Sequence, residues 1–242
     1  MSARTDAIVE WLRQRLASSD AKGFLVGLGG DAGSAIVAAL CHAAAPGRVI
    51  GVLMPCHGDA QADADARLVA DQFGIPAIRI DLAPAHDVLI EDLAYAAGHL
   101  PDGHAAPAEL PMANVKPRLR MTTMSFLAEA LNYLVAGSIN RSELAIGGFT
   151  PHGDGSGDVL PIGHLLQREV SEAAADLGVP DDIVATMARG FVWRDERFTY
   201  SDLENYLTNG PEAVAPAVAM RIERLIRQSE HTRALPPTPE LT

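Results

Sequence analysis

A chain of 242 residues, 48% of them hydrophobic, is long enough to bury one substantial core, so a single domain over residues 1–242 is expected. The formal net charge of -12 argues against a protein that binds nucleic acid or a membrane surface, because both need a concentrated basic surface. Cys41 and Cys56 are the only cysteines, and no apolar run approaches the roughly 20 residues of a membrane span, so a cytoplasmic protein is expected.

The first third of the chain alternates between helical and strand patterns. Ile8, Trp11, Leu12 and Leu16 recur at helical spacing and predict an amphipathic helix. Apolar runs bounded by glycine or proline predict buried strands at 23–28 and 49–54 and a third strand at 75–80, with helices at 34–45 and 60–73. This alternation predicts an α/β protein with a Rossmann-like, doubly wound parallel sheet and flanking helices.

The pattern is less regular in the rest of the chain. Residues 98–113 lack periodicity and predict a mobile surface loop, and a long helix is expected at 115–131. Strands are expected at 133–137 and, shorter, at 144–147. A polar loop at 150–163 is too long for a simple turn, helices follow at 165–177 and 211–228, and the tail after residue 231 is proline-rich.

A glycine-rich turn follows the first predicted strand. It reads Gly-Leu-Gly-Gly-Asp-Ala-Gly-Ser-Ala from Gly27 to Ala35 and leads into an apolar helix. Ligands of parallel sheets bind at the carboxyl ends of the strands, and backbone N–H groups at such a turn suit phosphate. A nucleotide site is therefore expected here.

Collinear motifs along the chain resemble the ammonia-dependent NAD synthetases. They are Gly51-Val-Leu-Met-Pro55, Asp65-Ala-Arg-Leu68, Asn114 with Arg118-Leu-Arg-Met121, Asn140-Arg-Ser-Glu143, Gly153-Asp-Gly155 with Asp158, Pro161-Ile-Gly163, Leu177-Gly-Val-Pro180, and Ser229-Glu-His231 with Arg233. The resemblance implies an adenine nucleotide alpha hydrolase-like fold and a homodimer. It also implies a reaction in which ATP and magnesium adenylate deamido-NAD, after which ammonia displaces AMP.

The resemblance also carries roles onto matching positions. The ATP-binding positions are Gly27, Gly29, Gly30, Ser34, Met54 and Ser138. Contact with a deamido-NAD-like substrate is implied for Arg118, Asp158 and His231, and magnesium binding for Glu143. Arg118 and Asp158 also fit a plain surface charge and a turn-forming aspartate.

Several ATP-side residues of the family are missing. Gly33 stands where the family has a metal-binding aspartate, and Pro151 and Gln167 stand where it has lysines. If each lost charge contact were worth about 2 kcal/mol, three losses would cost on the order of 10⁴-fold in rate. Ordinary turnover is therefore not expected from the sequence.

Two replacements stay open. Asp31 either moves into the metal position left by Gly33 or only caps the following helix. Arg189 and Arg194 either supply phosphate-binding cations or form solvated pairs with neighbouring acids.

Three functions consequently remain. The first is an active NAD synthetase, or a diverged ATP-dependent amide ligase that acts on another carboxylate. The second is a catalytically inactive paralogue that binds a nucleotide or dinucleotide as a sensor or scaffold. The third is a structural partner that pairs with an active synthetase subunit.

Overall fold

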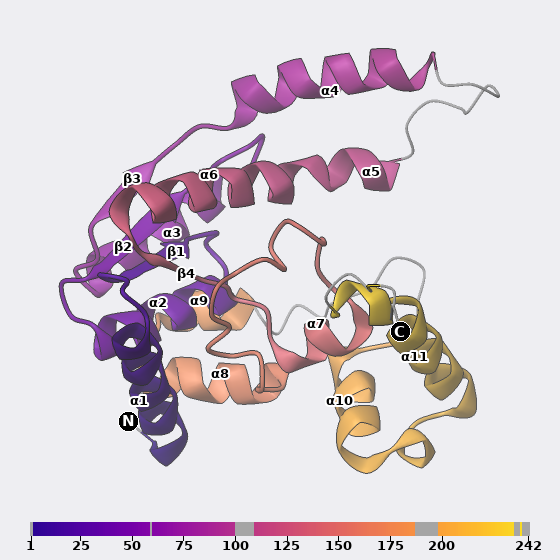
Figure 1. Cartoon of the computed structure of the whole chain (residues 1–242). Helices are drawn as coiled ribbons and strands as arrows, with labels where there is room; N and C mark the ends of the chain where they lie inside the picture. The colour runs from indigo at the N-terminus through magenta and orange to yellow at the C-terminus, as the bar shows by residue number, and fades with distance from the viewer. Residues whose placement is uncertain (1, 59, 100–108, 187–197, 235–237, 239–242) are drawn as a thin grey trace.

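A parallel sheet forms the centre of the fold (Figure 1). The structure is a computed structural model that describes residues 2–58, 60–99, 109–186, 198–234 and 238. Within these residues the sheet has the strand order β3-β2-β1-β4. The strands are β1 (Phe24–Gly27), β2 (Val49–Leu53), β3 (Ala77–Arg79) and β4 (Leu134–Ala136). All three pairings are parallel, so the carboxyl ends of the strands meet at one edge.

Helices flank the sheet and continue beyond it (Figure 1). In chain order they are α1 (Ala3–Ser18), α2 (Ala32–Ala44), α3 (Ala60–Gln72), α4 (Ala83–Ala97), α5 (Glu109–Ala113), α6 (Val115–Leu131), α7 (Arg141–Ile146), α8 (Gln167–Asp176), α9 (Asp181–Thr186), α10 (Tyr200–Asn209) and α11 (Pro216–Gln228). The predicted α/β, Rossmann-like fold is thus confirmed, with four of the five predicted strands in place. Among the described residues, no helix is both long and apolar enough to span a membrane.

The alternation of side chains along β1 feeds two hydrophobic cores. Phe24 and Val26 belong to a cluster that also holds buried residues of α1, α2 and α8. Leu25 faces the opposite side, where it joins a cluster with Val52 of β2 and Met124 of α6. Successive strand residues point to opposite faces, so a short apolar run can serve both layers.

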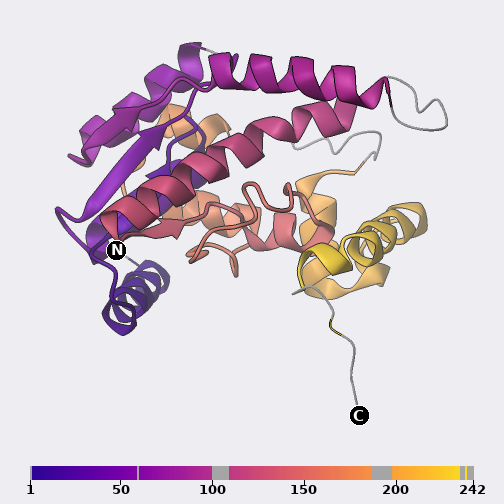
Figure 2. The ribbon, with the colours of Figure 1, turned by 45° about the horizontal axis from the view of Figure 1, so that its top comes forward.

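A third, smaller core lies under the helices that follow the sheet. Ile146 of α7 packs there with Leu203 of α10 and Ile222 of α11, all with exposures of 2% or less. These helices group together in Figures 1 and 2. His231 follows α11 in the chain.

The predicted strand at 144–147 is wrong, because these residues end α7. Asn140 accepts a hydrogen bond from the Glu143 N–H, while the Glu143 side chain accepts one from the Asn140 N–H. This capping box starts the helix, and Gly147, at φ 67°, ends it in the left-handed conformation. The local hydrogen bonds override the strand-like apolar run.

The predicted loop at 98–113 is wrong in part. Its last residues form α5, whereas residues 100–108 lie outside the described residues. Helix α4 was not expected at all. None of its residues is buried, although it carries large apolar side chains such as Val88, Leu89 and Leu93.

Candidate functional site

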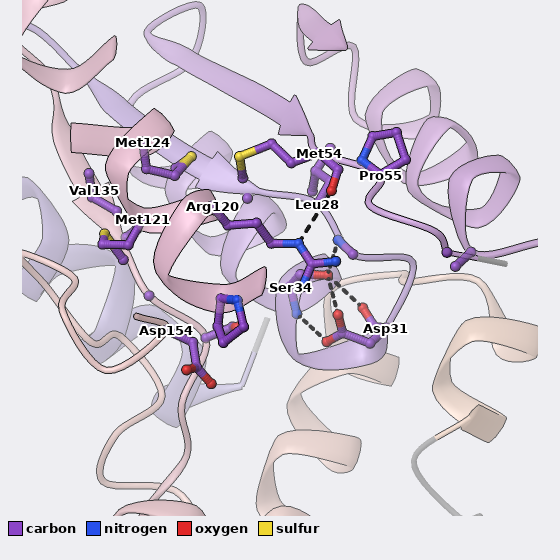
Figure 3. A pocket seen from close by; sticks show the side chains of 18 of the residues that line it. Leu28, Asp31, Ser34, Met54, Pro55, Arg120, Met121, Met124, Val135 and Asp154 are labelled. Atoms are coloured by element: carbon purple, nitrogen blue, oxygen red, sulfur yellow. Dashed lines mark hydrogen bonds between the residues drawn. The ribbon is translucent and has the colours of Figure 1, made fainter. Parts of the chain in front are cut away.

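A cavity of about 410 Å³ opens at the carboxyl ends of β1, β2 and β4 (Figure 3). Its volume lies within the roughly 300–1,000 Å³ typical of small-molecule sites. The lining includes six residues singled out from the sequence: Gly27, Gly29, Asp31, Ser34, Met54 and Ser138. The expected nucleotide site therefore coincides with a real hollow of suitable size.

The glycine-rich turn is held by hydrogen bonds between its own residues. Asp31 caps α2, because its Oδ1 accepts from the Ser34 N–H at 2.9 Å. The Ser34 hydroxyl donates to Asp31 Oδ2 at 3.0 Å and accepts from the Gly29 N–H at 3.2 Å. Gly30 lies outside the lining, but its φ of +76° and a hypothetical Cβ only 2.2 Å from the Ala62 carbonyl oxygen require a glycine.

The carboxylate of Asp31 lies beside Gly33. A Cβ built on Gly33 would lie 3.1 Å from Asp31 Oδ1 and 3.4 Å from the Ser138 carbonyl oxygen. A carboxylate is therefore present close to where the side chain of the family's aspartate would start. Helix capping and an approach to the position of Gly33 are thus compatible in one conformation.

Glu143 lies close enough to Asp31 to feel its charge. Partial burial, strengthened by the negative charges of Asp31 and Asp154, raises the pKa of Glu143 to about 7. Hydrogen bonds from the Asn140 N–H and the Tyr200 hydroxyl act in the opposite direction. Carboxylate oxygens are the ligands that Mg²⁺ prefers. Glu143 does not line the cavity, however, so its expected role as a magnesium ligand stays a prediction.

Arg120 and Asp154 line the cavity although the sequence analysis gave them no role. Figure 3 shows Arg120 directed into the hollow between the methionine side chains and Asp31, and its Nε donates to the Met54 carbonyl oxygen at 3.3 Å. The sequence feature that could have pointed to Arg120 is its spacing from Arg118. Residues two apart on a helix point to different sides, so these two arginines face different surroundings.

The opposite wall of the cavity is apolar. It includes the side chains of Leu28, Met54, Met121 and Met124, seen together in Figure 3. Flexible, polarizable methionines pack well against a flat aromatic ring. The cavity therefore joins an apolar end to a polar end that carries Asp31, Ser34 and Arg120.

The three residues expected to contact the dinucleotide do not line this cavity. Arg118 donates from Nε to the Pro151 carbonyl oxygen at 3.2 Å. Asp158 Oδ2 accepts from the Val135 N–H at 2.8 Å and so ties the polar loop to β4. His231 is exposed in a short 3-10 helix after α11. Their roles toward substrate stay predictions.

The two positions without lysine are engaged otherwise. Pro151 holds Arg118 through its carbonyl group, and Gln167 Oε1 accepts from Asn140 Nδ2 at 2.6 Å. Gln167 thus helps to hold the residue that caps α7. Arg189 and Arg194 lie outside the described residues.

Comparison with known proteins supplies the family. The sequence model of NAD synthase matches residues 4–236. The NH3-dependent NAD+ synthetase of Carboxydothermus hydrogenoformans is 39% identical over 98% of this chain and 97% of that protein. The chain belongs to the NAD synthase family. A second relative, the NH3-dependent NAD+ synthetase of Methanocaldococcus jannaschii, is 32% identical over 100% of this chain and 98% of that protein.

Solved structures agree with this membership of the NAD synthase family. The NMN synthetase of Francisella tularensis superposes with a TM-score of 0.86 at 26% identity, covering 98% of both chains. The NH3-dependent NAD synthetase of Campylobacter jejuni gives a TM-score of 0.82 at 22% identity, also over 98% of both chains, and supports the fold alone.

Proposed function

We propose that this NAD synthase family chain uses ATP to amidate the carboxylate of a nicotinate nucleotide with ammonia. The observation that carries the proposal is the cavity at the strand ends, where an apolar wall, a phosphate-type turn, an arginine and a carboxylate face one ligand-sized space. The sequence analysis expected lost turnover from the replacements at Gly33, Pro151 and Gln167. The nearness of Asp31 to Gly33 weakens the first of these three arguments.

ATP would lie with its base against the methionines and its phosphates toward the turn. The N-terminus of α2 offers backbone N–H groups and the positive end of a helix dipole. Arg120 supplies a cation, and Ser34 and Ser138 supply hydroxyl groups. Asp31 and Glu143 would hold Mg²⁺, which offsets phosphate charge when it is bound.

The reaction would run in two steps. The carboxylate oxygen of the acceptor attacks the α-phosphorus of ATP, forming an acyl adenylate and releasing pyrophosphate. Ammonia then attacks the acyl carbon, so that the amide forms and AMP and a proton leave. Arg118, Asp158 and His231 are proposed to bind the acceptor. The chain's own contribution is to position both substrates and to stabilise charge that develops on phosphate.

The acceptor is either a dinucleotide or a mononucleotide. The relatives named NAD synthetase support deamido-NAD as the acceptor of this chain. The F. tularensis protein named NMN synthetase supports nicotinic acid mononucleotide instead. Each acceptor is incubated with the protein, ATP, Mg²⁺ and ammonium, and the amide is measured by chromatography. Amide from at least one acceptor supports the proposal. Tight nucleotide binding without amide or AMP would instead indicate a binding protein.

We also infer a homodimer that uses the surface of α4, α5 and α6. Large apolar side chains are exposed there: Val88, Leu89, Leu93, Tyr95, Leu110 and Phe126. Exposed apolar patches of this kind commonly mark protein interfaces, and a two-fold dimer pairs one patch with its copy. Light scattering of wild type and Phe126→Glu tests this, because the charge should shift the chain toward monomer. An unchanged dimer would place the interface elsewhere.

A further inference from the structure

Two histidines and an aspartate meet outside the cavity, where the segment after β2 comes against the start of α4. His57 Nε2 lies 2.5 Å from Asp87 Oδ1, and His86 Nδ1 lies 3.2 Å from the same oxygen. One ligand-type atom from each residue lies within 4.8 Å of the other two. The His86 side chain is 12% exposed, whereas those of His57 and Asp87 are 48% and 58% exposed. The trio is thus anchored on one side and open to water on the other.

This donor set matches a transition metal better than magnesium or calcium. Imidazole nitrogen suits zinc, copper, iron and nickel, whereas the harder cations take oxygen ligands. In a tetrahedral zinc site with bonds of about 2.0–2.1 Å, neighbouring ligand atoms lie about 3.3 Å apart. The separations of 2.5 and 3.2 Å and the 4.8 Å limit bracket that value. Small side-chain rotations would therefore suffice to bind an ion.

The backbone at His57 has an uncommon conformation. His57 has a φ of 51°, in the left-handed region that few residues other than glycine adopt. The neighbouring residues Pro55 and Gly58 line the nucleotide cavity. An ion held by the trio would therefore connect the cavity wall to α4.

We propose that His57, His86 and Asp87 bind one divalent transition-metal ion of the zinc class, with water completing its coordination. The ion fastens the segment of residues 55–58 to α4. This site shares no residue with the ATP and magnesium positions of the proposed function. Its test therefore needs no substrate and stands whether or not the chain is a ligase.

The test uses the full chain without an affinity tag, stripped of metal and titrated with ZnCl₂ against a chelating dye. We expect about one zinc ion per chain in the wild type. His86→Asn and Asp87→Asn should each weaken zinc binding by at least about 100-fold, because a lost ligand costs more than the 10–100-fold of an outer-shell change. His57→Asn should do the same, and asparagine tolerates the left-handed backbone.

His99→Asn is the matched control. His99 follows the same helix, and its exposed ring contacts only the neighbouring turn among the described residues, through Nδ1 and the Tyr95 carbonyl oxygen. This variant should keep wild-type zinc affinity and the rise in unfolding temperature that zinc gives the wild type. Zinc affinity that stays the same in all three trio variants would overturn the proposal. So would a wild-type chain that binds no zinc, since the trio would then be only a hydrogen-bonded cluster.

Discussion

Restoring the family's aspartate with Gly33→Asp should harm this protein as long as Asp31 is present. The new Cβ would lie 3.1 Å from Asp31 Oδ1. Two carboxylates roughly 4–5 Å apart repel by about 1 kcal/mol in water and about 4 kcal/mol at an effective dielectric constant of 20. Because Asp31 is exposed, solvent screening keeps the cost near the lower end. We expect Gly33→Asp to lower the free energy of unfolding by about 1–2 kcal/mol.

The partner change is Asp31→Gly. It removes the cap of α2 but costs only a few tenths of a kcal/mol to about 1 kcal/mol, because glycine is itself acceptable at an N-cap. In the double variant the repulsion is gone, and one carboxylate returns to the family position. The double variant should therefore be more stable than the sum of the single changes by about 1–2 kcal/mol.

Urea unfolding of the four proteins in EDTA measures this coupling without metal. Additivity within about 0.5 kcal/mol would show that Asp31 does not approach the side chain at position 33. Pyrophosphate release with Mg²⁺ gives the second reading. The rate of pyrophosphate release should be about 30-fold lower in the Asp31→Gly variant, which corresponds to a lost charge contact of about 2 kcal/mol. The double variant should recover part of that lost rate.

Three further predictions concern single positions. Arg120→Gln should weaken ATP binding by about 10–100-fold in calorimetry, whereas the matched Arg118→Gln, outside the cavity lining, should change it less than about 3-fold. Asn140→Ala should cost about 2–3 kcal/mol in urea unfolding, because it removes the cap of α7 and leaves Gln167 without that donor. Hydrogen bonds from Ser2 and Thr5 lower the pKa of Asp176, so stability present at neutral pH should fall as the pH drops through that lowered pKa. The Asp176→Asn variant should lose less stability at acid pH than the wild type. Urea midpoints that are the same for both proteins at every pH from 3 to 7 would argue against this prediction.

The central strands could be predicted because burial on both faces produces a recognisable sequence pattern. Residues 24–27 and 49–53 are apolar without alternation and are bounded by glycine or proline, as buried parallel strands require. Helix α7 was missed although Asn140 and Glu143 are spaced as a capping box. Helix α4 was missed although its sequence carries several large apolar residues, and none of its residues is buried. That residues 1–242 form one domain stays a prediction.

Only part of the candidate site could be predicted from the sequence. The turn and Met54 could be found because they follow strands in sequence, whereas Arg120 depends on which side of α6 faces the cavity. The sequence left two roles open for Asp31, because the choice depends on where one side chain points relative to Gly33. Its hydrogen bonds and its distance to that position come only from the folded loop.

The most direct measurement is AMP and pyrophosphate production by the purified chain with ATP, Mg²⁺, ammonium and each nicotinate nucleotide. We predict AMP, pyrophosphate and amide in equal amounts, all dependent on the acceptor and all sharply reduced in Asp31→Asn. Absence of AMP above a protein-free blank, in a chain that still binds ATP, would contradict the proposed ligase and favour an inactive nucleotide-binding relative.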